Sequence, residues 1–83
     1  MEKILKALAN RRRIAILAYL KKRREAAVGD ISREIKLSFK STSKHLNVLR
    51  VVDIVERDQR GLQMFYCLSA KQRPEAGAII KFL

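Results

Sequence analysis

The chain has 83 residues, of which 48% are hydrophobic, and its 19 Lys and Arg against 8 Asp and Glu give a formal net charge of +11. This length suits one domain with one small core, and it leaves little room for the walled pocket of an enzyme. The composition excludes a disordered tail, and no apolar run approaches the roughly 18 residues that span a membrane.

Two amphipathic helices are predicted at the N-terminal end. Apolar residues lie between lysines over residues 3–9, which indicates a short helix. Asn10 can cap a second helix over residues 11–23, because its side chain accepts hydrogen bonds from free backbone N–H groups. The expected inward stripe of the second helix is Ile14, Leu17, Ala18 and Leu20.

A tight turn is expected between a third and a fourth helix. The helical pattern of apolar residues is interrupted at Gly29 and Asp30, and a short helix can begin there and run to Lys36. Leu37 and Ser38 form the turn, and Ser38 is a good N-cap for a helix from Phe39 to residue 51 or 52.

The fourth helix has two distinct faces. Thr42, Leu46 and Leu49 are spaced i, i+4 and i+7, so they are expected to point into the core. The opposite face is small, polar and basic, and the sequence has no acidic residue between Lys36 and Arg50.

After the fourth helix the hydrophobic period changes from about 3.6 to 2, which predicts a β-hairpin. Residues 54–57 and 62–68 are the expected strands. The turn is expected over residues 58–61, where Gly61 tolerates a positive φ. Pro74 can then open a final helix over residues 75–82.

This order of elements is that of a mainly α winged helix-turn-helix domain over residues 1–83, with the hairpin as its wing. The major groove of B-DNA is about 12 Å wide and admits one α-helix. A folded domain with a large positive charge usually binds a polyanion. We therefore expect double-stranded DNA as the partner. The residues expected to face DNA, on the fourth helix and the wing, are Lys40, Ser41, Ser43, Lys44, His45, Asn47, Arg50, Arg57, Gln59 and Arg60.

Two motifs follow a known pattern. The series Leu-Ser, four residues, Ser, one residue, His-Leu, two residues, Leu is matched by Leu37, Ser38, Ser43, His45, Leu46 and Leu49. A basic hairpin with a glycine and a strand ending Tyr-x-Leu, here residues 66–68, come next. Together with a weaker match upstream, residues 5–68 resemble the ArsR-type winged-helix repressors. The resemblance implies a dimeric transcriptional repressor.

The chain departs from that family in three places. Asp53 stands where the family often has Gly, and Arg11 stands where it has Pro. Metal-sensing members carry Cys-x-Cys before the turn, and the matching positions are Ala27 and Gly29. Because Cys67 is the only cysteine and His45 the only histidine, we expect no bound metal and no other cofactor.

The two ends of the chain are expected to form a homodimer through helices at residues 2–9 and 75–83. A monomer would leave apolar side chains of such short helices exposed to water. Burial of each large one in a dimer stabilises the protein by about 1.5–3 kcal/mol. The residues expected at this dimer surface are Ile4, Leu5, Leu8, Ile79, Ile80, Phe82 and Leu83.

Two other function classes stay open. A winged helix can serve as a protein-interaction module. An acidic outward face on the fourth helix would favour that function, whereas here this face is basic. An RNA-binding domain usually exposes aromatic residues for base stacking, and here only Phe39 is a candidate. No nucleophile, base and orienting group occur together, so we expect no enzyme. The single cysteine and the N-terminus without an apolar signal-peptide stretch predict a cytoplasmic location and no membrane partner.

Overall fold

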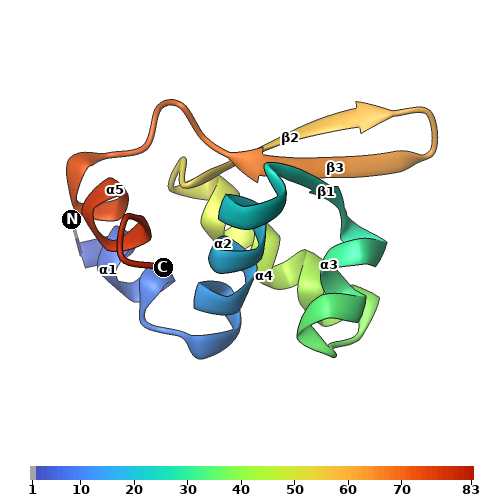
Figure 1. Ribbon diagram of the computed structural model, residues 1–83, viewed down its shortest axis with the longest axis horizontal. Coiled ribbons are helices and arrows are strands. Elements are labelled where there is room, and N and C mark those ends of the chain that lie inside the picture. The colour runs from blue at the N-terminus through green and yellow to red at the C-terminus, as the bar shows by residue number, and fades with distance from the viewer. Residues whose placement is uncertain (1) are drawn as a thin grey trace.

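The computed structural model describes residues 2–83 and shows a mainly α winged helix-turn-helix fold. Its elements in chain order are α1 (Glu2–Leu8), α2 (Arg11–Arg23), β1 (Glu25–Ala27), α3 (Val28–Ile35), α4 (Phe39–Val51), β2 (Val55–Arg60), β3 (Gln63–Leu68) and α5 (Pro74–Ile80). Figure 1 shows the β2–β3 hairpin along one side of the helices, with its tip extending beyond them.

Side-chain caps set the starts of α2 and α4, as predicted. Asn10 Oδ1 accepts hydrogen bonds from the backbone N–H groups of Arg12 at 2.9 Å and Arg13 at 3.1 Å. Ser38 Oγ accepts one from the N–H of Ser41 at 3.1 Å. These bonds satisfy donors that have no partner within the helix, so both helices begin at the expected residues.

Two non-glycine residues adopt left-handed backbone conformations around α4. Lys36, with φ of 57°, ends α3, and the next residue donates its N–H to the carbonyl of Ser32 at 3.0 Å. Asp53, with φ of 59°, follows α4 at the position where the family often has glycine. Aspartate tolerates this conformation better than most residues, which explains how the turn forms without glycine.

The core is organised around α2, which contacts α1, α3, α4, α5 and the sheet. Ile16, Leu17 and Leu20 are its buried residues, whereas Ile14 and Ala18 are only half-buried. The predicted stripe was therefore wrong in omitting Ile16, because a helix enclosed on several sides buries a wider face than one stripe. On α4 the predicted inward residues are all buried: Thr42, Leu46 and Leu49.

The sheet has the strand order β1-β3-β2, with both pairs antiparallel. Strand β1 was not predicted, because three residues are too short for a period-2 pattern and alanine is a poor strand former. The predicted turn at residues 58–61 was also wrong. Strand β2 continues to Arg60, and the chain reverses at Gly61, with φ of 61°, and Leu62.

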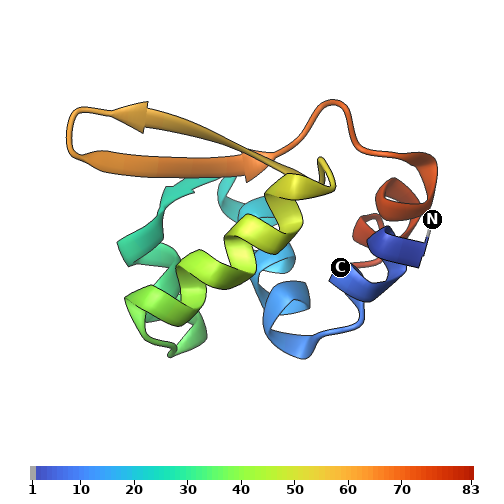
Figure 2. The same ribbon diagram turned by 180° about the vertical axis from the view of Figure 1, so that it is seen from behind.

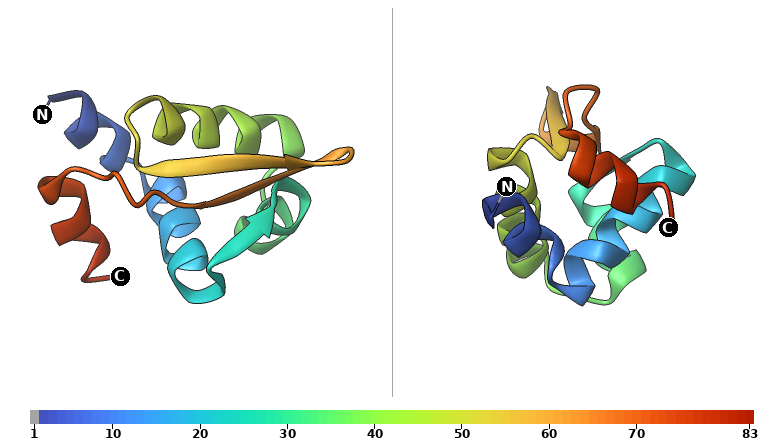
Figure 3. Two further views of the ribbon diagram at one scale, coloured as in Figure 1. Left: turned by 90° about the horizontal axis from the view of Figure 1, so that it is seen from above. Right: turned by 90° about the vertical axis from the view of Figure 1, so that its left-hand side faces the viewer.

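The terminal helices lie at the end of the molecule away from the hairpin tip (Figures 2 and 3). Helix α1 packs against α5 of the same chain, and α4 runs across the domain alongside the hairpin (Figures 2 and 3). No helix within residues 2–83 has the length and apolar character required to cross a bilayer.

Candidate nucleic-acid interface

Helix α4 presents an open stripe opposite its buried one. Lys40, Lys44, Asn47 and Val51 follow the spacing i, i+4, i+7 and i+11, and all four are exposed. Among residues 2–83, neither lysine of this stripe forms an ion pair. The positive charge of α4 is therefore available to a partner.

The first turn of α4 adds small and apolar groups to this face. Ser41 and Ser43 are half-buried on either side of the stripe, and Phe39 is 62% exposed at the helix start. An exposed apolar side chain beside lysines suits a thymine methyl in the major groove. Phe39 was not among the predicted site residues, although its place directly after the capping serine was visible in the sequence.

His45 lies at the edge of α4 that faces α1 and α2. Its Nδ1 lies 3.2 Å from Nη1 of Arg13. The Arg13 side chain also donates to the carbonyls of Ala7 at 2.6 Å and Lys6 at 3.2 Å. Burial and the nearby cations Arg13 and Arg12 lower the pKa of His45, so the ring stays neutral and can accept from Arg13. Sequence reasoning missed this role of Arg13, which joins α1, α2 and α4.

Arg50 lies where α4 meets the wing. Its Nη2 donates to Asn47 Oδ1 at 2.8 Å, which fixes the orientation of that amide. Arg50, Arg57 and Lys71 line one groove of about 350 Å³, together with the carboxylates of Asp53 and Glu56. The structure thus brings predicted residues of α4 and of the wing to one surface.

The strand register separates the predicted wing residues. Arg57 pairs with Tyr66 and Gln59 with Met64, so Arg57 and Gln59 share the sheet face that turns toward the core. Arg60 pairs with Gln63 and lies on the opposite face. We name this opposite face the outer face. It carries Glu25, Glu56, Asp58, Arg60, Phe65 and Cys67.

Arg60 is held by carboxylates on the outer face. Its Nη1 and Nη2 donate to the two carboxylate oxygens of Glu25 at 3.0 and 2.8 Å, and its Nε donates to Asp58 Oδ2 at 2.9 Å. The guanidinium carbon lies 4.6 Å from the centre of the Phe65 ring. These bonds raise the pKa of Arg60 and lower the pKa of Glu25.

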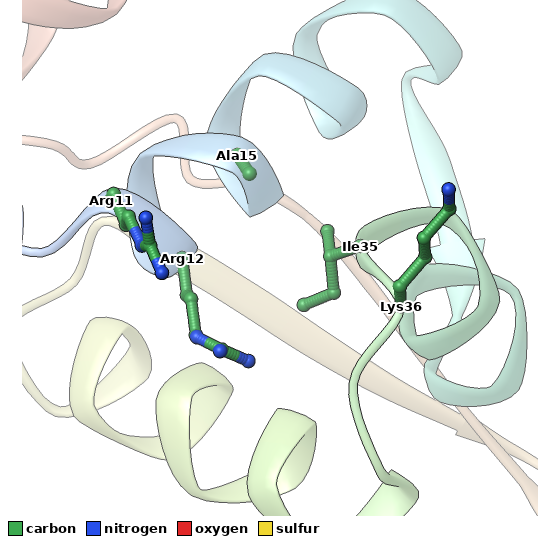
Figure 4. Close-up of a pocket in the computed structure, with 5 residues that line it drawn as sticks. All are labelled: Arg11, Arg12, Ala15, Ile35 and Lys36. Carbon is green, nitrogen blue, oxygen red and sulfur yellow. The ribbon is translucent and has the colours of Figure 1, made fainter.

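A cationic pocket of about 270 Å³ lies between the start of α2 and the end of α3. Its lining is Arg11, Arg12, Ala15, Ile35 and Lys36. Figure 4 shows the Arg12 side chain directed from α2 toward α4. Sequence reasoning did not assign these cations to the site, although the run of three arginines at the start of α2 was a signal for them.

The residues that could bind a metal do not come together. Among residues 2–83, no three His, Cys, Asp or Glu side chains are grouped closely enough to hold an ion. Cys67 is half-buried on the outer face of the sheet, where burial and the neighbouring Glu56 and Glu25 raise the pKa of its thiol. A thiol with a raised pKa is a poor metal ligand and nucleophile near neutral pH.

The predicted dimer residues divide into two groups. Ile4, Leu8 and Ile80 are buried in the core of the protomer itself, because α1 and α5 pack on each other within one chain. The expectation that these three form a dimer surface was therefore wrong. The apolar residues left at the surface, fully or partly, are Leu5, Ile79, Phe82 and Leu83.

The chain is similar in sequence and in fold to known bacterial regulatory proteins. The family model for bacterial regulatory proteins of the arsR family matches residues 10–57. The transcriptional activator HlyU of Vibrio cholerae is 38% identical over 80 residues, which are 96% of this chain and 70% of HlyU. The structure of reduced HlyU matches with a TM-score of 0.83 at 37% identity, covering 98% of this chain and 81% of that one.

Two further solved structures are similar. The transcriptional repressor PagR of Bacillus anthracis has a TM-score of 0.78 at 28% identity, covering 98% of this chain and 88% of PagR. A homodimeric winged helix-turn-helix DNA-binding domain from Mycobacterium bovis, described as a possible ArsR-family regulator, has a TM-score of 0.84 at 26% identity. That match covers 98% of this chain and 71% of the other.

Proposed function

This chain belongs to the arsR family of bacterial regulatory proteins, and on that premise we propose that it is a transcriptional regulator that binds double-stranded DNA. The observation that carries the proposal is the stripe on α4 with Lys40 and Lys44, neither of which forms an ion pair among residues 2–83. This stripe lies opposite the buried stripe that anchors the helix. A positive stripe on a helix that fits the major groove is the electrostatic pattern that a phosphate backbone selects.

We further propose a division of roles among the site residues. Side chains on the open stripe and beside it contact base edges, and those at the edge of α4 and on the wing contact phosphates. The base-edge group is Lys40, Ser41, Ser43, Lys44 and Asn47, and the phosphate group is His45, Arg50, Arg57, Gln59 and Arg60. Phosphate contacts set the position of the protein, and base contacts set the sequence preference.

The protein is proposed to act as a homodimer. The homodimeric relative from Mycobacterium bovis supports this, and so does the apolar surface at Leu5, Ile79, Phe82 and Leu83. A two-fold dimer would place two reading helices about 34 Å apart, one turn of DNA, which suits a palindromic site. Sedimentation of the double variant Leu5→Ser, Phe82→Ser tests this. The expected result is a dimer for the parent protein and a folded monomer for the variant, and a monomeric parent at micromolar concentration contradicts it.

We propose repression as the outcome of binding, with no catalytic activity and with a cytoplasmic location. PagR is a repressor, whereas HlyU is an activator, so a reporter gene behind a bound site decides the direction. No metal site is proposed, because Ala27 and Gly29 occupy the positions at which metal-sensing relatives have thiols.

A mobility-shift comparison of duplex DNA with single-stranded RNA of the same length tests the proposed function. Duplex binding that is weakened by Lys44→Ala supports it. Preference for the RNA indicates an RNA-binding domain instead, and failure to bind either nucleic acid indicates a protein-interaction module. Lys81→Ala, which removes one cation at the far end of the chain, is the control for the change in charge.

A further inference from the structure

Arg60 reaches across the whole sheet to bind Glu25. Strand β3 lies between β1 and β2, so a side chain at the end of β2 must pass over β3 to contact the start of β1. It does so above the ring of Phe65, a residue of β3. The guanidinium therefore lies folded back over the outer face and away from the hairpin tip.

The contacts of Arg60 occupy the groups that would bind a phosphate. Three of its N–H groups donate to carboxylate oxygens, two to Glu25 and one to Asp58. Carboxylate and phosphate both bind the guanidinium fork through two parallel hydrogen bonds. Two of the five guanidinium N–H groups remain, one on each Nη, and these do not point the same way. A phosphate that binds through two parallel bonds must therefore displace at least one carboxylate bond.

The exchange of one anion for the other is energetically feasible. The side chains of Arg60 and Glu25 are about half exposed, at 48% and 47%, and exposed ion pairs contribute little to stability. The neighbouring carboxylate of Glu56 is not a replacement, because it accepts hydrogen bonds from the Ser69 hydroxyl and the Ala70 N–H. Glu25, assisted by Asp58, is thus the group that decides where Arg60 lies.

We propose that Glu25 and Asp58 compete with DNA phosphate for the guanidinium of Arg60, and so weaken the contact of the wing with DNA. This inference rests on the proposed function, since it needs DNA as the partner. It assigns to Glu25, which precedes α3 by only a few residues, a role as an intramolecular competitor that sequence reasoning did not find.

Four proteins test the proposal: the parent, Glu25→Gln, Arg60→Gln and the double variant. Their affinity for a short random-sequence duplex is measured from about 50 to about 200 mM salt. Glu25→Gln is expected to tighten binding about two- to five-fold and to steepen the salt slope by up to about 0.9 per protomer, the value for one full phosphate contact. Asp58→Asn is expected to act in the same direction with a smaller effect.

Glu34→Gln is the matched control, because Glu34 is exposed on α3 and forms no ion pair among residues 2–83. In the Arg60→Gln background, Glu25→Gln is expected to change affinity no more than Glu34→Gln does. An equal effect of Glu25→Gln in both backgrounds, or weaker binding by Glu25→Gln alone, overturns the competition but leaves the proposed function standing. A parent protein that does not bind duplex DNA overturns both.

Discussion

Helix α4 and the wing are both basic in the sequence, but their cations have different surroundings. Lys40 and Lys44 project from α4 without an ion pair among residues 2–83, whereas Arg60 of the wing binds two carboxylates and lies over an aromatic ring. The reason is that Glu25, Glu56 and Asp58 gather on the outer face of the sheet, while α4 carries no acidic residue. Formal charge therefore overstates what the wing can offer to DNA.

The largest expected effect depends on both regions meeting phosphates. If a dimer neutralises about six to ten phosphates, its affinity for duplex DNA should fall roughly 10³–10⁵-fold between about 50 and 200 mM salt. Fluorescence anisotropy with labelled duplex at increasing salt measures this. An affinity that does not change with salt would show that neither region binds phosphates.

The second largest expected effect is on the free energy of unfolding, which should depend on α4 more than on the tip of the wing. Leu46 is completely buried on the inward face of α4, and Leu62 is fully exposed at the hairpin tip. Leu46→Ala should lower the free energy of unfolding by about 2–5 kcal/mol, because it leaves a cavity in the core. Leu62→Ala should change it by less than about 0.5 kcal/mol. Urea unfolding measures both, and similar values for the two variants would contradict this packing.

Sequence preference should depend on α4 more than on the wing. Lys44→Ala should reduce the difference in binding free energy between a preferred and a random duplex by about 1–3 kcal/mol, if Lys44 contacts a base edge. Arg60→Ala should weaken binding to both duplexes equally. Competition assays with selected and random duplexes make the comparison, and matching behaviour of the two variants would refute the division of roles.

Within the wing, the two arginines should differ. Arg57 forms no ion pair among residues 2–83, so Arg57→Ala should reduce the salt slope by about 0.9 per protomer, the value for a full phosphate contact. Arg60→Ala should reduce the salt slope by less, because Glu25 competes with phosphate for the N–H groups of Arg60. Salt titrations of the two variants side by side measure the difference, and a larger loss for Arg60→Ala would run against it.

No effect is expected from metals, because no three potential ligands lie together among residues 2–83. His45 lies on α4 and Cys67 lies on the outer face of the sheet, so they cannot join in one tetrahedral site. Zinc, cadmium or arsenite at micromolar concentration should leave the protein–DNA complex intact in a mobility shift. Release of DNA that Cys67→Ser abolishes would show a site that these residues do not suggest.

Much of the fold followed from local chemistry. Asn10 and Ser38 cap α2 and α4 where predicted, because a capping side chain needs only its own next few N–H groups. The inward stripe of α4 was likewise correct, since a helix with one face on the core shows a plain period of 3.6. The positive φ at Gly61 was expected too, although the turn itself begins later than predicted.

The sequence by itself determined the order of the helices and the hairpin, the basic face of α4 and the resemblance to a family of regulators. Only the tertiary structure decided three further points. Strand β1 exists because β3 offers it an edge, and no local pattern encodes that pairing. Ile4 and Ile80 entered the core because α1 meets α5 in the same chain. Arg60 lies against Glu25, 35 positions away, because the register of a three-stranded sheet brings together charges that the linear sequence keeps apart.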